Sequence, residues 1–312
     1  MLKPYSIYGA SGAIGNYLHK LYEDLTIPIE RNEVYPESRK VIYLISSTSN
    51  RTDGDHLQEN INTNLTILLD RLESCREKGI DEFNFISSWF VYGEPSFTTA
   101  TCCNYNMHVP YFMEGDHCNP KGFYSITKRT AEQIIIEYCN MHNIKWRIMR
   151  LANIYGNDSK ASQHKNILHH CINKLRKDES VNLYGLRGPI YRDYVHVYDA
   201  SRAIMHLAQR SQSNQIYNIG QGPKEIFSLG DAVRIAKTIL KSNSEVSFTK
   251  INPTDFPGHI EIASLGNDRL LSTGFSFSIP FFNGLEDLCT HQEFSTAAPI
   301  SVMRKSMLLS PV

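Results

Sequence analysis

The sequence predicts an α/β protein in which a parallel β-sheet is covered by helices. Short apolar runs alternate along the chain with longer amphipathic stretches, which is the pattern of repeated strand–helix units. A glycine-rich turn at 9–15 joins the first apolar run to the first amphipathic stretch. With 312 residues the chain can form one large α/β domain or two smaller ones.

The expected strands are the short apolar runs, and they cover 5–10, 41–45, 81–87, 146–151, 194–197 and 217–220. The expected helices have apolar residues at helical spacing, and they cover 13–24, 55–78, 124–141, 162–177, 200–209 and 229–241. Gly79 ends the second helix, and the breaker Asn-Pro-Lys-Gly at 119–122 precedes the third. Residues 291–312 lack such a pattern and are expected to form an extended tail.

Charge and cysteine content argue against several classes of protein. Lys and Arg number 32 and Asp and Glu also number 32, so the net charge of zero argues against a nucleic-acid binder. No apolar run approaches the ~18–20 residues that span a bilayer. The 7 cysteines are odd in number and form no Cys-x-x-Cys pair. We therefore expect reduced thiols in a cytoplasmic protein rather than a disulfide framework or a zinc site.

The glycine-rich turn spaces Gly9, Gly12 and Gly15 as G-x-x-G-x-x-G between a strand and a helix. Glycine permits tight backbone angles there, and the bare N–H groups of a helix N-terminus bind phosphate. Its place at the first strand favours a dinucleotide-binding fold of the Rossmann type, although such a turn can also serve packing alone. The residues expected to contact the cofactor in this turn are Gly9, Ser11, Gly12, Ala13, Ile14 and Gly15.

Two further motifs carry chemistry. Tyr124 and Lys128 are four residues apart at the start of a helix and share one face. An ammonium near a phenol favours the phenolate, so Lys128 is expected to lower the pKa of Tyr124 and to let it exchange a proton with a substrate hydroxyl. Ser88 ends a strand at the edge where parallel sheets bind ligands. The alternatives are a surface tyrosine–lysine pair and an ordinary strand-ending serine.

These motifs and several others, in this order, resemble the extended short-chain dehydrogenase/reductase family, specifically its nucleotide-sugar epimerase/dehydratase branch. The resemblance covers about residues 5–288. The further matches are Asn60, Glu132, RLANIYG at 150–156, RDYVHV at 192–197 and YNIG at 217–220. The resemblance implies a Rossmann-type doubly wound parallel sheet with a smaller C-terminal α/β domain that binds the substrate.

The resemblance also implies a role for individual residues. Tyr124 would be the acid/base, Lys128 would bind the nicotinamide ribose and Ser88 would assist at the sugar. Asn153 would contact the nucleotide-sugar. Arg192 would hold its diphosphate, a role that suits a guanidinium.

The implied cofactor is NAD, with NADP left open. Ser46, after the strand 41–45, and Asn60 are expected to line its site. In the family an acidic residue after the second strand binds the adenosine ribose, but no clear strand ending in aspartate lies between the glycine turn and Val41. Glu30 can take that place and favour NAD, whereas Arg31 can accept the 2′-phosphate of NADP. Either can equally be a solvated loop charge.

Departures from the family pattern argue against some of the reactions that the family catalyses. Dehydratases of this branch carry an Asp-Glu pair after the serine or threonine, and this chain has Trp89 and Phe90, which cannot move protons. Decarboxylases also use a glutamate in this segment, so a 4-epimerase or a 4-keto reductase is favoured. The sequence FPGH at 256–259 stands where the family often has Arg-Pro-Gly-Asp. Arg192 or another cation such as Arg187 must then hold more of the diphosphate.

The predicted function is an NAD(P)-dependent 4-epimerase of a nucleoside-diphosphate hexose, similar to UDP-glucose 4-epimerase. The alternatives are an NAD(P)H-dependent reductase of 4-keto-6-deoxysugar nucleotides and a catalytically silent nicotinamide-binding protein. No metal is expected, because neighbouring residues on a helix point in different directions. We therefore do not expect the neighbouring side chains of His164, His169, His170 and Cys171 to form a metal site. His196 is expected to be structural.

The expected domains are a nucleotide-binding domain over 1–155 with 192–222, a substrate domain over 156–191 with 223–290, and a tail over 291–312. The resemblance further implies a homodimer in which the helices 55–78 and 124–141 of both copies form a four-helix contact. The expected partners are therefore a nucleoside-diphosphate sugar and a second copy of the chain, with no nucleic acid and no membrane.

Overall fold

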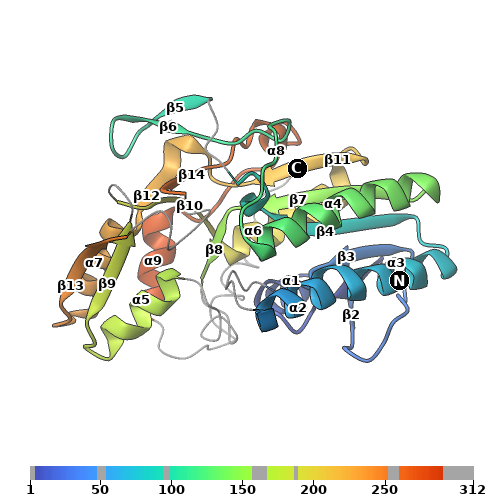
Figure 1. The fold of residues 1–312 in the computed structure, drawn as a ribbon, viewed down its shortest axis with the longest axis horizontal. Coiled ribbons are helices and arrows are strands. Elements are labelled where there is room, and N and C mark those ends of the chain that lie inside the picture. Colours follow the sequence, from blue (N-terminus) through green and yellow to red (C-terminus); the bar gives the residue numbers. More distant parts are fainter. Residues whose placement is uncertain are drawn as a thin grey trace.

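The structure is a computed structural model that describes residues 4–47, 54–93, 98–156, 167–185, 189–251 and 260–290. Its centre is a six-stranded sheet in the order β11-β7-β4-β3-β1-β2, in which every neighbouring pair is parallel (Figure 1). The strands are β1 (Tyr5–Tyr8), β2 (Thr26–Ile29), β3 (Lys40–Tyr43), β4 (Glu82–Ser88), β7 (Lys145–Leu151) and β11 (Gln215–Ile219).

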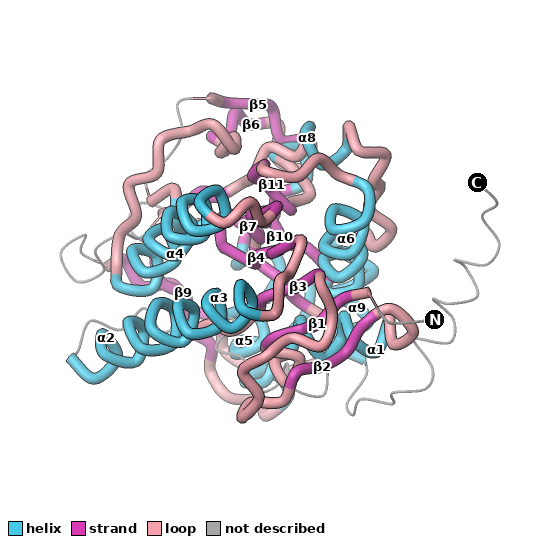
Figure 2. Tube along the Cα trace, turned by 90° about the vertical axis from the view of Figure 1, so that its right-hand side faces the viewer, coloured by secondary structure: helices cyan, strands magenta, loops and turns pink. Residues whose placement is uncertain are grey.

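Helices cover both faces of this sheet, as Figure 2 shows. One face carries α1 (Ala13–Leu21) and α6 (Val197–Arg210). The other carries α3 (Ile67–Glu77) and α4 (Phe123–Met141), preceded by α2 (Gly54–Ile61). This arrangement confirms the predicted Rossmann-type doubly wound sheet.

Alternation along the strands explains why both faces are buried. Ile7 and Ile42 pack on the α1 and α6 side, whereas their neighbours Tyr8 and Tyr43 pack on the α3 and α4 side. All four side chains are at most 1% exposed. Strands buried on two faces read as continuous apolar runs, which is why the sequence predicted them well.

The remaining elements form smaller layers around a second core, at the left of Figure 1. The strand β10 (Tyr191–His196) lies between β12 (Ile226–Ser228) and β14 (Ile262–Ala263), and it also pairs with β8 (Asn153–Tyr155). A two-stranded parallel sheet joins β9 (Val181–Gly185) to β13 (Val246–Lys250). The helices here are α5 (Ile167–Arg176), α7 (Leu229–Leu240) and α9 (Phe281–Thr290), whereas the short α8 (Asp268–Leu271) lies beside β11 and buries Leu270 in the core of the large sheet.

Two features of the first half differ from the expectation. The strand β2, not evident from the sequence, lies at the sheet edge, where the missing N–H of Pro28 costs no ladder bond. The connection 30–39 then returns to β3 without a helix and packs on β1. Tyr8 donates to the carbonyl of Val34 at 2.5 Å, and Ser6 Oγ accepts from the backbone N of Ser38 at 2.9 Å. The usual doubly wound order continues with another strand beyond the second, and this sheet instead ends at β2.

The predicted helix 55–78 is also not uniform. It consists of α2 and α3 with a single wide turn between them, the π-helix η1 (Asn62–Thr66). The chain between β4 and α4 contains the 3₁₀ turn η2 (Trp89–Val91) and a hairpin of β5 (Thr99–Cys102) and β6 (Met107–Pro110), neither of which was predicted.

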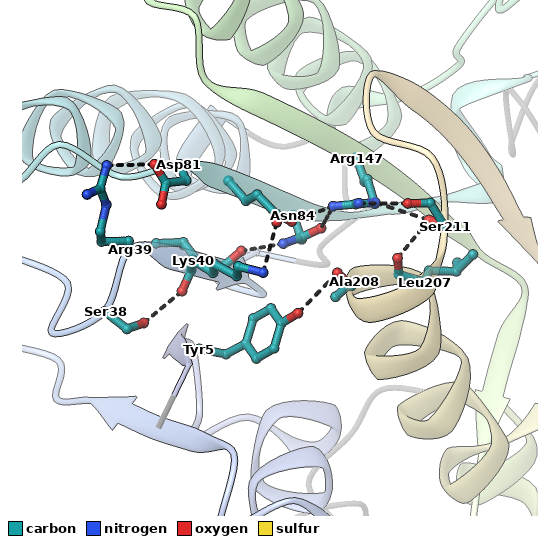
Figure 3. A network of polar contacts seen from close by, with 12 residues as sticks. Tyr5, Ser38, Arg39, Lys40, Asp81, Asn84, Arg147, Leu207, Ala208 and Ser211 are labelled. Carbon is teal, nitrogen blue, oxygen red and sulfur yellow. Dashed lines mark hydrogen bonds and ion pairs between the residues drawn. The ribbon is translucent and has the colours of Figure 1, made fainter. Parts of the chain in front are cut away.

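A polar network holds the edge of the sheet at which the strands begin (Figure 3). The guanidinium of Arg147 donates to Glu82 at 2.6 Å, to Asn84 at 3.3 Å and to the carbonyl of Ser211 at 2.8 Å. Lys40 lies 3.1 Å from Glu82. Strand starts in such sheets serve stability, because ligands bind at the opposite edge.

Replacing Arg147 with methionine is therefore expected to destabilise the fold by about 2–3 kcal/mol, because Glu82 keeps its charge in a buried place and loses its best partner. Urea unfolding followed by circular dichroism measures the change. The matched control is Arg39→Met, because the Arg39–Asp81 pair has side chains that are 71% and 50% exposed. That control is expected to stay within about 0.5 kcal/mol of the wild type, and equal losses in both variants would contradict the account.

Candidate active site

The predicted site residues gather at the edge where the six parallel strands end. β1 runs into the glycine turn, β3 into Ser46, β4 ends at Ser88, and β7 is followed by Asn153. In open parallel sheets this edge binds ligands. Residues that are far apart in the sequence thus come to one side of the molecule.

The glycine turn has the geometry of a phosphate cradle. Gly9 has φ +83°, and a Cβ on Gly15 would lie 2.3 Å from the carbonyl oxygen of Gly9. Gly12 is the N-cap of α1, carries no side chain that could cap the helix, and donates its N–H to the carbonyl oxygen of Gly9 at 3.0 Å. The first turn of α1 contains no acidic residue. The positive end of the helix is thus available to an anion, and the turn fits the pyrophosphate of a dinucleotide.

The two candidates for the adenosine ribose lie in a suitable place. Glu30 and Arg31 directly follow β2, whose last residue, Ile29, pairs with Tyr8 at the end of β1. Both side chains are exposed. The strand that the family pattern requires before them is therefore present, although it ends in isoleucine followed by glutamate.

The hydroxyls of Tyr124 and Ser88, which the sequence predicted as separate motifs, lie within hydrogen-bonding reach of each other. Tyr124 lies in the first turn of α4, whose N-cap is Gly122, and both Tyr124 and Ser88 are 8% exposed. Burial raises the pKa of Tyr124, while hydrogen bonding with the hydroxyls of Ser88 and Ser46 acts in the opposite direction. Two serine hydroxyls thus lie beside the phenol, one after β3 and one at the end of the neighbouring strand β4.

Lys128 lies one turn after Tyr124, but its ammonium has another partner. Nζ donates to the carbonyl of Ile86 at 2.7 Å and lies 4.4 Å from the centre of the Phe85 ring. Burial lowers the pKa of Lys128 to about 7, against the opposing effect of Glu132. The expectation that Lys128 lowers the pKa of Tyr124 is therefore wrong for this structure, in which burial dominates the phenol and a backbone carbonyl of β4 holds the ammonium.

A buried ionic network fixes α4 to the strands behind the site. Glu132 accepts two hydrogen bonds from Arg150, at 3.0 and 2.7 Å, and one from Ser87 at 2.6 Å. Arg129 adds a contact at 2.9 Å. The guanidinium of Arg150 lies 4.7 Å from the centre of the Tyr92 ring. The helix that carries Tyr124 and Lys128 is thereby joined to both β4 and β7.

The two predicted substrate contacts lie on paired strands. Asn153 begins β8, which pairs with β10, and its amide donates to the carbonyl of Asp193 at 3.3 Å. Arg192 on β10 donates to the carbonyls of Tyr191 at 2.8 Å and Glu261 at 3.0 Å. Burial lowers the pKa of Arg192 to about 10, so this cation stays charged near neutral pH.

Aromatic rings fill the space between Arg192 and Tyr124. The guanidinium of Arg192 lies 5.4 Å from the centre of the Trp89 ring, which stacks on Phe90 at 4.1 Å. The Phe90 ring in turn meets Tyr124 edge-on at 6.0 Å. The residues that replace the proton-transferring pair of the dehydratases therefore form an apolar wall beside the phenol.

Other predicted residues lie elsewhere. His196 accepts a hydrogen bond from the backbone N of Tyr198 at the start of α6. His169 contacts the carbonyl of Gly156 at 3.1 Å, and His170 is exposed. Across the described ranges no group of three or more His, Cys, Asp or Glu is placed to hold a metal ion. The predicted positions outside the described residues are His164, Arg187, 256–259 and 291–312.

One buried residue at this edge, Asn64 in η1, was not predicted from the sequence. Its side chain contacts Ser46, Ser47 and Thr127, and it also lies 3.3 Å from Asn60. Asn60, which the sequence predicted to contact the cofactor, donates to the carbonyl of His56. Its side chain is fully buried. The signal that could have found Asn64 is its place among the apolar positions of the helix 55–78.

The chain matches the family described as the NAD dependent epimerase/dehydratase family over residues 24–220, which is more than half of its 312 residues. The chain belongs to this family. NAD, the cofactor predicted from the sequence, is the cofactor that the description of the family names.

Curated relatives are similar over parts of their length. The low-salt glycan biosynthesis protein Agl12 of Haloferax volcanii is 25% identical over 72% of this chain and 66% of its own. A putative UDP-glucose 4-epimerase of Methanocaldococcus jannaschii is 29% identical over 51% of this chain and 48% of its own. The CDP-abequose synthase of Salmonella typhimurium is 28% identical over 53% of this chain and 54% of its own. The chain therefore spans about half to two-thirds of these relatives.

Among solved structures, the UDP-glucose 4-epimerase of Thermotoga maritima with UDP-glucose has a TM-score of 0.77 at 18% identity, covering 97% of this chain and 99% of that one. This similarity confirms the fold over nearly the whole chain. Among the described residues, no helix has both the length and the apolar character needed to cross a membrane.

Proposed function

We propose that the protein is an NAD-dependent 4-epimerase of a nucleoside-diphosphate hexose, with UDP-glucose and UDP-galactose as the first pair to test. The observation that carries the proposal is the meeting of the Tyr124 and Ser88 hydroxyls in a buried place at the strand ends, on the same sheet edge as the glycine turn. A hydroxyl-bearing substrate is recognised there by hydrogen bonding, and proton exchange needs a titratable group within reach.

Each residue then has one task. NAD, when bound, supplies the redox chemistry at the sugar carbon. Tyr124 Oη takes the proton of the C4 hydroxyl as that carbon becomes a carbonyl, and it returns the proton when the hydroxyl forms again. Ser88 Oγ holds the same sugar oxygen and fixes the path of the proton. Their burial keeps water away from the reacting carbon.

The residues on β8 and β10 serve the nucleotide part of the substrate. Arg192 presents a cation that suits a diphosphate, and Asn153 presents an amide on the neighbouring strand. Trp89 and Phe90 hold no titratable group, so the elimination of water that a dehydratase requires has no acid or base at these positions. We therefore propose only oxidation and reduction at the sugar carbon C4, without elimination of water.

A second candidate is an NAD(P)H-dependent reductase of 4-keto-6-deoxysugar nucleotides. Its specific support is the similarity to CDP-abequose synthase, together with the apolar wall of Trp89 and Phe90. This reaction also needs only Ser88, Tyr124 and Lys128 from the chain. A catalytically silent nicotinamide-binding protein is the third possibility, and the buried Tyr124 and Ser88 argue against it.

Incubation of the purified protein with UDP-glucose, without added cofactor, separates these functions. An epimerase regenerates its cofactor in every cycle, so UDP-galactose is expected to form until equilibrium. A reductase consumes a reduced cofactor, so no conversion would occur, and the same protein would oxidise NADPH when a 4-keto-6-deoxysugar nucleotide is added. Absence of both reactions would contradict the enzymatic proposal.

The domain division and the assembly are proposals as well. We propose that 1–155 with 192–222 forms the nucleotide half and 156–191 with 223–290 the substrate half, followed by the tail 291–312.

We also propose a homodimer through α3 and α4, which lie side by side in Figure 2 and expose Leu69, Ile126 and Met141. Sedimentation of a stable monomer at micromolar concentration would contradict the dimer. The seven free cysteines support a cytoplasmic location.

A further inference from the structure

The hairpin of β5 and β6 lies in the stretch of chain between β4 and α4, yet it packs on the small sheet of β12, β10 and β14. Its buried side chains Cys102 and Val109 form a cluster with Ile226 of β12. Figure 1 shows the hairpin beside β14, on the side of β12 and β10. A segment that joins the strand and the helix of the proposed proton-transfer site thus reaches the sheet that carries Arg192.

The turn of the hairpin holds β12, one of the two neighbours of β10. The amide of Asn104 donates to the carbonyl of Ile226 at 3.2 Å. The hydroxyl of Tyr105 accepts from the backbone N of Ser228 at 2.9 Å. Ser228 is the residue that pairs with Tyr191 in the antiparallel ladder of β12 and β10. The turn therefore fixes β12 at both of its ends.

The side chain of Tyr105 is held from several sides. While its hydroxyl accepts from Ser228, it donates to Oδ2 of Asp231 in the first turn of α7 at 2.8 Å. Burial raises the pKa of Tyr105 to about 12, so the hydroxyl keeps the proton for this bond near neutral pH. The ring meets that of Tyr191 edge-on, with the centroids 5.0 Å apart. One side chain thus joins the hairpin to β12, α7 and β10.

The chain after the hairpin contacts the other neighbour of β10. The backbone N of Phe112 donates to the carbonyl of Ser264 at 2.9 Å, and the carbonyl of Phe112 accepts from Gly266 at 2.8 Å. Ser264 directly follows β14, in which Ala263 pairs with Arg192. The same stretch of chain therefore contacts both strands that flank Arg192.

The guanidinium of Arg192 is oriented by the backbone of this small sheet. Its Nη1 donates to the carbonyl of Tyr191, whose ring packs against Tyr105, and to the carbonyl of Glu261, which directly precedes β14. The direction of the cation thus depends on how β10 lies between its neighbours. A side chain that is oriented before the ligand arrives loses less conformational entropy on binding, so its orientation contributes to affinity.

We propose that Tyr105 is a positioning residue for Arg192, because it holds β12 and the ring of Tyr191 and so keeps the guanidinium where the diphosphate of a nucleotide-sugar binds. The inference rests on the proposed function, in which Arg192 holds that diphosphate. Tyr105 acts on the diphosphate only through these neighbours.

The decisive variant is Tyr105→Phe, which removes the hydroxyl and keeps the ring against Tyr191. Calorimetric titration of the purified protein with UDP, in the presence of NAD, is expected to give a Kd about fivefold above that of the wild type. Tyr105→Ala also removes the ring and is expected to raise this Kd by about twentyfold. KM for the nucleotide-sugar is expected to rise with Kd, while kcat stays within about twofold, because no contact with the reacting carbon changes.

A double-mutant cycle separates positioning of Arg192 from a general loss of stability. Arg192→Lys keeps the positive charge, so UDP still binds, but it loses the forked group that the two carbonyls orient. Tyr105→Phe added to Arg192→Lys is therefore expected to change the Kd by less than about twofold. The matched control is Tyr217→Phe, because Tyr217 is also buried and donates to the carbonyl of Gln212 at 3.0 Å, at the start of β11. This control is expected to lose stability and to bind UDP as the wild type does.

Asn104→Ala serves if the Tyr105 variants do not fold, because this exposed side chain contacts β12 independently. It is expected to raise the Kd by about twofold to threefold, with the same dependence on Arg192.

A wild-type Kd in Tyr105→Phe, or an equal loss of affinity with arginine and with lysine at position 192, would overturn the proposal. A wild type that binds neither UDP nor CDP would overturn it together with the proposed function. A wild type that binds UDP and shows the expected cycle, but converts no nucleotide-sugar, would overturn the proposed function alone.

Discussion

Replacing Tyr124 with phenylalanine is expected to lower turnover by about 10²–10⁴-fold, because the variant keeps the ring and loses the hydroxyl that carries the proton of the sugar in the proposed function. The ring contact with Phe90 and the burial of the helix start do not depend on the hydroxyl. Steady-state kinetics with the nucleotide-sugar, at several pH values, measures the loss.

Tyr5→Phe is the matched control for this prediction. Tyr5 is also buried, and its hydroxyl donates to the carbonyl of Ala208 at 3.0 Å, at the far edge of the sheet. The control is expected to keep its turnover and to lose about 1 kcal/mol of stability. Tyr124→Phe with wild-type turnover would remove the tyrosine from the chemistry and would contradict its proposed role as the acid/base.

The largest loss of stability is expected for Glu132→Ala. This substitution leaves the guanidinium of Arg150 buried, with a side chain that is 1% exposed, and removes its bidentate partner. Breaking a buried ion pair by removal of one partner typically costs about 3–5 kcal/mol. Urea unfolding measures the difference, and turnover is expected to fall as well because Glu132 holds α4 to β4 and β7.

A double replacement tests the physical reason for this loss. Glu132→Leu combined with Arg150→Met removes both buried charges, so only the neutral Ser87 hydroxyl loses its partner in the core, and the double variant is expected to be more stable than Glu132→Ala. A double variant less stable than Glu132→Ala would mean that the cavity, and not the uncompensated charge of Arg150, causes the loss of stability in Glu132→Ala. A single variant as stable as the wild type would contradict the account of the network.

Much of the fold could be predicted because its strands are buried on both faces and its helices are long. Tyr8, Tyr43 and their neighbours read as continuous apolar runs, and the glycine turn marks the first strand–helix unit. The strand β2 could not be recognised from its four residues, since it contains Pro28 and ends before Glu30. Only its place at the sheet edge makes the proline acceptable.

The hairpin of β5 and β6 depends on contacts that sequence patterns do not show. Tyr105, in its turn, donates to Asp231 at 2.8 Å, and Cys102 packs against Ile226, more than a hundred residues away. In β5, Thr99 and Thr101 are exposed, so the sequence lacks the alternation of apolar residues that would predict this strand.

The candidate site was predictable where one motif determines the position of a side chain. Ser88 and Tyr124 are brought together by the strand end and the helix start that the sequence already indicated. The direction of the Lys128 ammonium was not predictable, because its partner is a backbone carbonyl of another strand. Asn64 was missed for the same kind of reason, since only the wide turn η1 places its amide between β3 and α4.

The central claim is that hydrogen leaves and returns to C4 at this site while Tyr124 carries the proton. Incubation with UDP-glucose labelled with deuterium at C4, without added cofactor, tests it most directly when the product is analysed by nuclear magnetic resonance. The account predicts UDP-galactose that retains the deuterium at C4, since hydrogen transferred as hydride does not exchange with water. Loss of the label to the solvent, or no product in the presence of NAD, would contradict it.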